Sequence, residues 1–160
     1  MRTINISWDR TWMNIAEEIA TRSKDTTRQV GAVIVKNKKL LSLGYNGAPK
    51  GFNDNEIPDS KDRNDLPIKR KTTYMLHAEV NAVLNYGGSL QDLEGASIYV
   101  TTSPCFECAK VLAQVGIKRV IYKTEYNKPE LWEPSKVILS KCGVQLQKFE
   151  DILQEESSAN

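Results

Sequence analysis

Histidine, cysteine and long apolar runs are the scarcest features of this sequence. Its 160 residues include one histidine and three cysteines. Three cysteines do not form the even-numbered disulfide framework of a small secreted domain, and they fit a reducing compartment better. No apolar run approaches the roughly 20 residues that span a bilayer, and the first eight residues contain no apolar signal-peptide core. We therefore expect a soluble, cytoplasmic protein.

Net charge is also small. The 22 Lys and Arg residues nearly balance the 20 Asp and Glu residues, which leaves a formal charge of +2. A protein that holds a long polynucleotide needs many basic contacts to phosphates, so neither a polynucleotide nor a membrane is an expected partner. A small phosphorylated substrate needs only two or three donors. The hydrophobic content of 40% is ordinary for one globular domain, here residues 1–160.

Hydrophobic periodicity predicts helices alternating with strands. Helices are expected at 8–22, where Asp9 is the predicted N-cap, and at 73–86, 105–115 and 129–142, and strands at 30–35, 40–45, 96–101, 119–122 and 144–149. A helix between the last two strands makes them parallel. The predicted fold class is therefore α/β, a five-stranded mixed sheet with helices on both faces. Residues 53–71 are expected to be a polar loop, either solvated or a lid or subunit contact, and residues from about 154 to 160 a frayed tail.

One cluster of residues uses the only histidine. His77-Ala78-Glu79 is followed, 28 positions after the histidine, by Cys105 and then by Cys108. One imidazole and two thiolates suit Zn²⁺, and three protein ligands leave a fourth tetrahedral position for water. Glu79 could move protons to and from that water. His-x-Glu followed by Pro-Cys-x-x-Cys is the signature of the zinc nucleobase deaminases.

Each of these residues also has a structural interpretation. Cys105 and Cys108 could form a structural zinc knuckle, but such sites have four protein ligands. The fourth would have to be a carboxylate or Cys142, which is expected to be a small buried hydrophobe. Glu79 alone could simply stabilise a helix N-terminus. Beside a zinc ligand, it is interpreted as the proton shuttle.

Four blocks of sequence resemble, in order, those of the deoxycytidylate deaminases in the zinc-dependent cytidine and deoxycytidylate deaminase superfamily. The blocks are residues 30–35, 44–49, 77–82 and 101–109, and the resemblance runs from about residue 8 to residue 149. The Gly-Tyr-Asn-Gly-x-Pro block at 44–49 points to the deoxycytidylate branch. The resemblance implies a cytidine deaminase-like three-layer α/β/α fold. It also implies a hydrolase that converts dCMP to dUMP and ammonia for thymidylate synthesis.

The resemblance also implies roles for single residues. Water attacks C4 of cytosine, while Glu79 takes the water proton and delivers protons to N3 and to the departing amine. The backbone N–H of Ala78 holds the base carbonyl, and the carbonyl of Ser103 receives the amine. Asn46 contacts the sugar and orients the base. Tyr126 packs on the nucleotide or hydrogen-bonds it, or is an ordinary half-buried aromatic side chain.

The phosphate donors are expected first at Arg22, Ser23 and Lys24, with Arg28 close behind. The alternative for each basic residue is a solvated surface charge. Some family members carry a second, structural zinc ahead of the active-site motif. Residues 23–76 contain no Cys and no His, so no second zinc site of that kind is expected here.

Regulation is a further implication of the resemblance. Deoxycytidylate deaminases are often hexamers that dCTP, with Mg²⁺, activates and dTTP inhibits. The segment with Asn46, Gly47, Lys50 and Gly51 resembles the part that receives the effector, and its glycines would let backbone N–H groups approach phosphates. The alternative is a turn that only shapes the substrate pocket.

Two kinds of rival function stay open from the sequence. One is another zinc deaminase, acting on tRNA adenosine, a guanine-like base, free cytidine or dCTP. The small type of free-cytidine enzyme tends to join its last two strands by a turn, which the helix expected at 129–142 disfavours. The other rival is a non-catalytic, zinc-stabilised nucleotide-binding module, whose mark would be a fourth protein ligand or the loss of Glu79.

Overall fold

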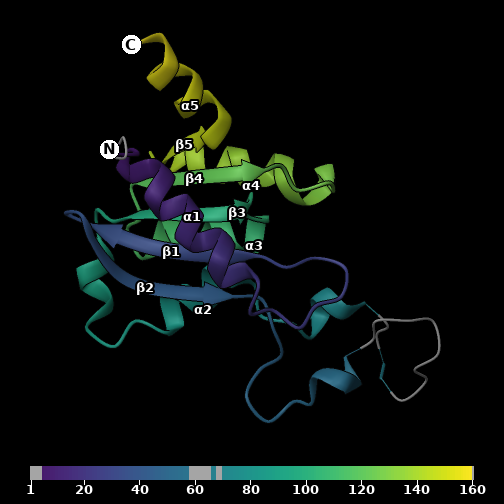
Figure 1. The fold of residues 1–160 in the computed structure, drawn as a ribbon. Helices are drawn as coiled ribbons and strands as arrows, with labels where there is room; N and C mark the ends of the chain where they lie inside the picture. Colours follow the sequence, from purple (N-terminus) through teal and green to yellow (C-terminus); the bar gives the residue numbers. More distant parts are fainter. Residues whose placement is uncertain (1–4, 58–65, 68–69, 160) are drawn as a thin grey trace.

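The computed structural model describes residues 5–57, 66–67 and 70–159. Its centre is a five-stranded sheet in the order β2-β1-β3-β4-β5. The strands are β1 (Gly31–Lys36), β2 (Lys39–Tyr45), β3 (Ser97–Thr102), β4 (Arg119–Thr124) and β5 (Gln145–Lys148). β1 is antiparallel to β2 and β3, whereas β3, β4 and β5 are parallel (Figure 1). The predicted mixed sheet with its last two strands parallel is confirmed.

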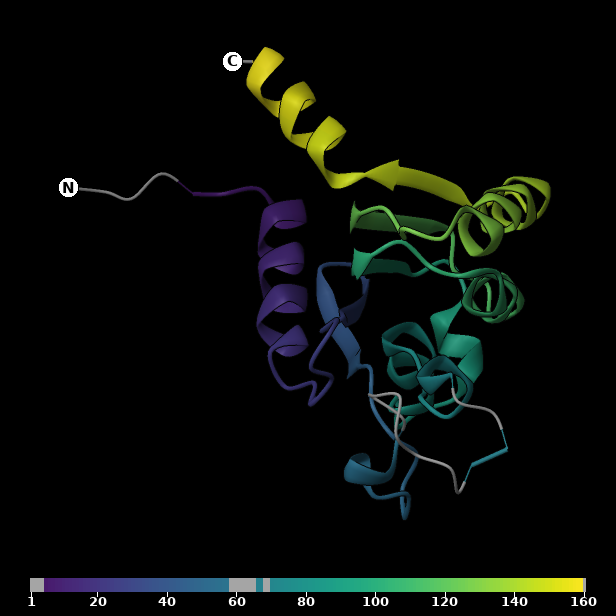
Figure 2. The ribbon, with the colours of Figure 1, turned by 90° about the vertical axis from the view of Figure 1, so that its right-hand side faces the viewer.

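Helices cover both faces of this sheet, as the side view in Figure 2 shows. The helices are α1 (Trp8–Ala20), α2 (Ala78–Leu84), α3 (Phe106–Gln114), α4 (Pro129–Lys141) and α5 (Phe149–Ser158), with short 3-10 turns η1 (Asp54–Glu56), η2 (Lys71–Thr73) and η3 (Leu90–Leu93). α1 and α5 lie on one face, and α2, α3 and α4 on the other. None of the described helices is long and apolar enough to cross a membrane.

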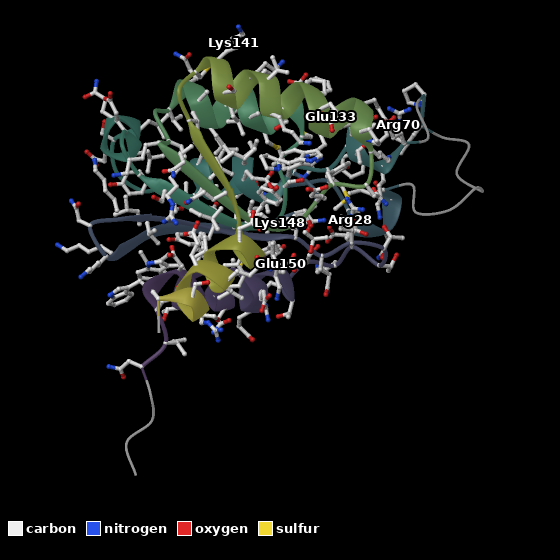
Figure 3. The ribbon with its side chains drawn as sticks, turned by 90° about the horizontal axis from the view of Figure 1, so that it is seen from above. Arg28, Arg70, Glu133, Lys141, Lys148 and Glu150 are labelled. Carbon is white, nitrogen blue, oxygen red and sulfur yellow. The ribbon has the colours of Figure 1, made fainter. Side chains whose placement is uncertain are left out.

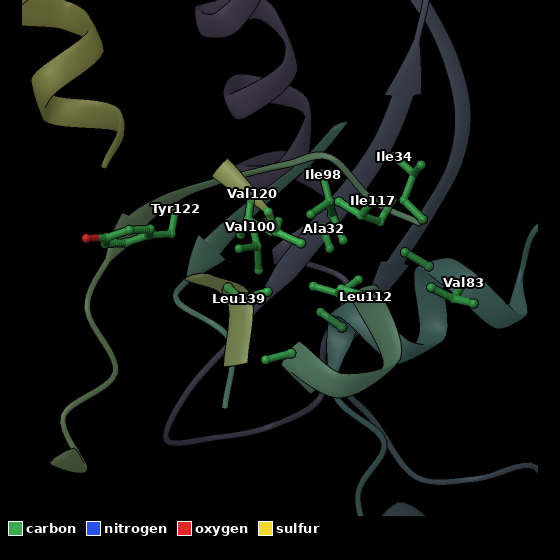
Figure 4. Packing of buried hydrophobic residues seen from close by; sticks show 14 of the residues in the cluster. Ala32, Ile34, Val83, Ile98, Val100, Leu112, Ile117, Val120, Tyr122 and Leu139 are labelled. Atoms are coloured by element: carbon green, nitrogen blue, oxygen red, sulfur yellow. The ribbon is translucent and has the colours of Figure 1, made fainter. Parts of the chain in front are cut away.

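Two hydrophobic clusters fill the spaces between the three layers. Alternate residues of β1 supply both, because successive strand side chains point to opposite faces. Ala32 and Ile34 pack toward α2, α3 and α4, and Val33 and Val35 toward α1 and α5. Figure 4 shows part of the first cluster, including Ile98, Val100, Leu112, Val120 and Leu139. The central strands are thus buried on both sides, which explains why residues 30–35 form one unbroken apolar run.

The helix expected at 73–86 begins later, at Ala78. Leu76 forms an isolated β-bridge with Gly47, in which the Leu76 N–H donates to Gly47 at 2.8 Å and the Gly47 N–H donates back at 3.0 Å. This pairing holds residue 76 in an extended conformation, so the helix cannot start before it. Residues 71–73 form the separate turn η2 instead.

The two ends of the chain also differ from expectation. Ser7, rather than Asp9, caps α1 by accepting a hydrogen bond from Arg10 N at 3.3 Å. The Asp9 carboxylate instead pairs with Arg119 at 3.0 Å. The expected frayed tail is helical to Ser158, because Phe149 and Ile152 of α5 are buried against the α1 side of the sheet.

Of the predicted loop at 53–71, residues 58–65 and 68–69 lie outside the described residues, so its predicted role as a lid or subunit contact stays a prediction.

Two backbone features of the β1–β2 hairpin matter for the rest of the fold. Asn37 and Lys38 have φ values of 53° and 58°, which the favoured two-residue hairpin turn requires. Gly44 in β2 lies directly under α2, and a Cβ added there would stand 2.3 Å from Ala82 N. Only glycine therefore lets α2 lie this close to β2.

Candidate active site

The three predicted metal ligands meet where two helices begin. His77 is the N-cap residue of α2, Cys105 is that of α3, and Cys108 lies one turn into α3. The Nδ1 atom of His77 lies 3.2 Å from Sγ of Cys108 and 3.4 Å from Sγ of Cys105, and the two sulfurs are 3.6 Å apart. Donors bonded tetrahedrally to one zinc ion stand about 3.6–3.8 Å apart. The donor set therefore fits zinc with little rearrangement.

Local backbone geometry leaves these side chains available. His77 has φ −79° and ψ 157°, Cys105 has φ −73° and ψ 169°, and neither side chain caps its own helix. β3 ends at Thr102, so Cys105 follows the carboxyl end of a central strand. In open α/β sheets, ligands bind at the carboxyl ends of the strands. Both segments therefore turn from extended chain into helix at a metal-ligating residue, although the helix expected at 73–86 would have placed His77 inside it.

The two thiols are poised to lose protons in sequence. The hydrogen bond between the two sulfurs, supported by His77, lowers the pKa of Cys105 to about 4. The same contact, together with burial, raises the pKa of Cys108. The pair thus already favours one thiolate, and a divalent cation favours the second because only the thiolate is a metal ligand.

Glu79 occupies the first turn of α2 and is only 3% exposed. Burial raises the pKa of its carboxyl group, and the nearby His77 opposes that rise. A carboxyl group with a raised pKa can both accept and return a proton at neutral pH. Its position on the same cavity as the metal ligands suits it to that work.

A cavity of about 320 Å³ opens beside these groups. It brings together eight of the residues predicted from the sequence, namely Arg28, Asn46, His77, Ala78, Glu79, Ser103, Cys105 and Tyr126. These residues come from the segments on either side of the β1–β2 hairpin, the start of α2, the segment between β3 and α3, and the segment after β4. Glu79, two of the three predicted metal ligands and the predicted base-contacting residues therefore line one cavity, and Cys108 adjoins them through its contacts with His77 and Cys105.

The first candidates for the phosphate do not line this cavity. Ser23 is buried, and its hydroxyl donates to the carbonyl oxygen of Asn46 at 2.9 Å. Lys24 Nζ pairs with Asp54 at 3.1 Å, and Arg22 is exposed. Three other cationic side chains do line the cavity, those of Arg28, Lys71 and Lys128. Of these three, Arg28 was among the candidates expected from the sequence, and Lys71 and Lys128 were not.

Lys71 and Lys128 were missed because they are close to the site only in space. Lys128 follows β4, and the rule that ligands bind at the carboxyl ends of parallel strands could have identified it. Lys71 ends a polar stretch six residues before His77, and nothing in that stretch marks it. In the folded chain it forms an ion pair with Asp25 and a hydrogen bond with Thr27.

Asp25 organises the loop that carries Arg28. Its side chain is 3% exposed, and its carboxylate accepts hydrogen bonds from the amides of Thr27 at 2.8 Å and Arg28 at 3.1 Å. Burial by itself would raise the pKa of Asp25, but Lys71 and these amides outweigh it and lower that pKa. Asp25 is therefore ionised at neutral pH and holds Lys71 and Arg28 on one wall of the cavity.

The side chain of Asn46 is bonded on both of its ends. Its Oδ1 accepts from the Val30 amide at 2.8 Å, and its Nδ2 donates to Arg28 O at 2.9 Å and to Asp25 Oδ2 at 3.3 Å. Both amide protons are therefore used, and Oδ1 has capacity for one further donor. Asn46 Oδ1 can accept a hydrogen bond from a ligand hydroxyl while the Asn46 side chain braces the loop at 25–30.

Tyr126 also lines the cavity. Its backbone amide donates to the Ser103 hydroxyl at 2.7 Å, which ties the segment after β4 to the end of β3. The Arg28 guanidinium lies 4.7 Å from the centroid of the Tyr126 ring. Figure 3, viewed from above, shows Arg28 and Arg70 at the same end of the molecule. The Tyr126 ring and the Arg28 guanidinium thus stand together in the lining of the cavity.

Two other predictions are affected by the structure. Cys142 is exposed rather than buried, and it does not belong to the His77, Cys105 and Cys108 cluster. It follows α4 as a C-cap residue, where its side chain faces solvent.

In the predicted effector loop, the Gly47 amide is already bonded to Leu76, whereas Gly51 has φ +87° and Lys50 is exposed.

Comparison with known proteins agrees with this geometry. Residues 6–124 match the family model described as the cytidine and deoxycytidylate deaminase zinc-binding region. The chain belongs to this deaminase family. Its resemblance to the deoxycytidylate deaminases is confirmed by relatives such as the mouse enzyme of that name, which is 37% identical over 146 residues that cover 90% of this chain and 80% of the relative.

Other members of the deaminase family give the same picture. A probable deoxycytidylate deaminase of Drosophila melanogaster is 38% identical over 149 residues, which cover 89% of this chain and 72% of the relative. The dCMP deaminase of cyanophage S-TIM5, solved in complex with dCMP and dUMP, superposes with a TM-score of 0.71 at 30% identity. That match covers 91% of this chain and 99% of the phage chain.

Metal analysis of purified variants tests the zinc site. We expect one zinc ion per chain in the parent protein and less than about a tenth of that in Cys105→Ala, because two remaining ligands cannot hold the ion tightly. Cys142→Ser is the matched control and should keep its zinc, since Cys142 is exposed and outside the cluster. Equal zinc content in the two variants would contradict the assignment.

Proposed function

We propose that this chain is a zinc-dependent hydrolase that converts dCMP to dUMP and ammonia, which supplies dUMP for thymidylate synthesis. The observation that carries the proposal is the buried Glu79 on the same cavity as the His77, Cys105 and Cys108 cluster. No further Cys, His or carboxylate joins that cluster within the part of the chain that the structure describes. Three ligands and a proton-transferring carboxylate are the requirements of hydrolytic deamination. The relatives named deoxycytidylate deaminase support the choice of substrate.

The reaction needs one water, one acceptor for its proton and two proton deliveries. His77, Cys105 and Cys108 would hold the zinc, which would lower the pKa of a bound water to about 7. Glu79 takes a proton from the attacking water as the water oxygen bonds to C4 of cytosine, and then delivers that proton to N3. Glu79 then transfers the second water proton to the amine, the C4–N4 bond breaks, and dUMP and ammonia leave.

The chain's own backbone orients the base. Ala78 is the first residue of α2, so its N–H has no partner within the helix and can donate to the cytosine carbonyl. The Ser103 carbonyl, at the end of β3, accepts the departing amine. Asn46 Oδ1 accepts a hydrogen bond from the sugar hydroxyl, and Tyr126 packs against the nucleotide. These roles rest on the cavity position of the four residues and on the family resemblance.

The phosphate is bound at the cationic wall. Arg28, Lys71 and Lys128 line the cavity, and Arg28 is held by its contact with the Tyr126 ring. Arg and Lys side chains form charge-assisted hydrogen bonds with phosphate oxygens. These three residues take the place of Arg22, Ser23 and Lys24 in the phosphate assignment.

The alternatives are less well supported by the structure. The small free-cytidine enzyme was expected to join its last two strands by a turn, whereas α4 connects the parallel β4 and β5. A non-catalytic zinc module gives no reason to bury a carboxylate with a raised pKa beside the metal ligands. A likeness to a tRNA:A34 deaminase, at 19% identity and a TM-score of 0.56, reflects the shared fold alone.

Replacing the proton shuttle tests the catalytic assignment. In Glu79→Gln we expect dCMP deamination to fall by at least about 1000-fold, because the same group is needed for more than one proton transfer. Zinc content should stay at the parent level, and release of ammonia measures the rate. Glu107→Gln, on exposed α3 surface, is the control and should keep the parent rate. Parent-level activity in Glu79→Gln would refute the mechanism.

A charge variant tests the phosphate site. Arg28→Gln should raise KM for dCMP about 10- to 100-fold, since an arginine–phosphate contact is lost. Deoxycytidine has no phosphate and is expected to react slowly, and the rate of Arg28→Gln with it should stay within about threefold of the parent rate. Arg22→Gln is the matched control, because Arg22 is exposed and outside the cavity. An equal effect on the two substrates, or a larger effect in Arg22→Gln, would place the phosphate elsewhere.

We further propose that the protein is a homohexamer, activated by dCTP with Mg²⁺ and inhibited by dTTP. Support comes from the family resemblance of the loop that starts at Asn46, and from exposed Lys50 and the left-handed Gly51 in that loop. Asn46 also bonds Val30 and Arg28. A nucleotide bound at Lys50 and Gly51 could therefore move the wall of the substrate cavity through Asn46.

Rate measurements at low dCMP test this regulation. The parent should be faster with dCTP and Mg²⁺ and slower with dTTP, and Lys50→Gln should bring both ratios close to one. Lys141→Gln, at the end of α4 (Figure 3), is the control and should respond like the parent. Analytical ultracentrifugation should give six times the chain mass of 18.0 kDa. A parent enzyme that ignores both nucleotides would contradict the proposal.

A further inference from the structure

Helix α2 carries both His77 and Glu79 at its start, yet it is only seven residues long. A helix of two turns has little stability of its own, so its position must be set by what it packs against. It lies on β2, the edge strand of the sheet (Figure 1). Gly44 permits the close approach, and Ser42 Oγ donates to Ala82 O at 2.6 Å. α2 is therefore attached to β2 by specific contacts rather than by apolar packing alone.

Two asparagines, one turn apart on α2, bond to backbone carbonyls of β2. Asn81 Nδ2 donates to Tyr45 O at 2.7 Å, and Asn85 Nδ2 donates to Leu43 O at 2.9 Å. The two hydrogen bonds are chemically alike, but the two asparagines differ in their distance from Glu79 along the helix. Asn81 follows Glu79 by two residues, whereas Asn85 caps the far end of the helix.

On the β2 side, the Asn81 contact lies next to a residue that lines the cavity. Tyr45 is bonded covalently to Asn46, whose side chain holds Val30 and Arg28. Asn81 thus connects the helix that bears Glu79 to the strand end next to Asn46, which braces the segment that carries Arg28. The Asn85 contact reaches Leu43, which belongs to the hydrophobic packing on the α1 side.

We propose that Asn81 is a positioning residue, which sets the distance between the Glu79 carboxylate and the base held against the Asn46 wall. This inference rests on the proposed deamination of dCMP, and it adds a residue that touches neither the substrate nor the metal. Asn46 keeps its own bonds to Val30, Arg28 and Asp25 when Asn81 is changed. The part that shifts is α2, so the rate of the chemical step falls while nucleotide binding is largely kept.

The matched pair Asn81→Ala and Asn85→Ala tests the proposal. Each variant removes one side-chain hydrogen bond between α2 and β2 and replaces the asparagine with alanine, a strong helix former. Both should lower Tm by a similar amount, about 2–4 °C. In Asn81→Ala, kcat for dCMP should fall about 30- to 100-fold, because a displacement near 1 Å costs about that much, and KM should change by less than about threefold. Asn85→Ala should keep kcat within about twofold of the parent.

Zinc content and a second variant keep the test decisive. Rates are normalised to bound zinc, so that loss of metal through a displaced His77 is not counted as a loss of positioning. If Asn81→Ala does not fold, Asn81→Asp, which keeps the side-chain shape but replaces the amide donor with a charged carboxylate oxygen, should lower kcat by at least as much. Equal kcat in the Asn81 and Asn85 variants, at equal loss of Tm, would overturn the proposal. A parent chain that does not deaminate dCMP would overturn the proposed function instead.

Discussion

The structure depends on one constraint, that an imidazole nitrogen and two sulfurs from separate segments stand within 3.2–3.6 Å of one another. Such donors are held together only if two helix starts meet at a fixed distance. The sheet provides this arrangement, because β3 delivers the Cys105 helix from its carboxyl end and β2 supports the His77 helix from its edge. The central parallel strands and the close contact at Gly44 are thus parts of the metal site.

The cavity separates two chemical tasks into two environments. Around Glu79, burial raises the pKa of a carboxyl group that must exchange protons. At the other wall, Asp25 is buried too, but hydrogen bonds from Lys71 and from backbone amides lower its pKa and keep it charged. One carboxylate is therefore available for proton transfer, and the other serves as a fixed anchor for cationic side chains. The difference follows from which donors surround each group.

Much of the fold follows from local pattern, and so does the centre of the site. The unbroken apolar run at 30–35, the short polar turn after it and the helix before the last strand predict the succession of elements and the parallel pairing of the last two strands. His77, Glu79, Cys105 and Cys108 are recognisable because a metal site uses particular residue types at particular spacings. The structure brings His77, Cys105 and Cys108 together, with Glu79 on the same cavity.

What the sequence could not supply depends on contacts between distant segments. Ser23 looks like a phosphate donor until the fold buries it against Asn46, and Lys71 gains its place only through Asp25. The start of α2 is delayed by the bridge between Leu76 and Gly47. Cys142 stands in an apolar-looking stretch but lies at a helix end that faces solvent.

Zinc K-edge X-ray absorption on the purified holoprotein addresses the central claim most directly. The account predicts two sulfur ligands at about 2.3 Å, one imidazole nitrogen at about 2.0 Å and one further oxygen that exchanges with solvent. A shell made entirely of protein side chains, with a third sulfur or a bound carboxylate in the fourth position, would leave no place for the attacking water and would contradict it.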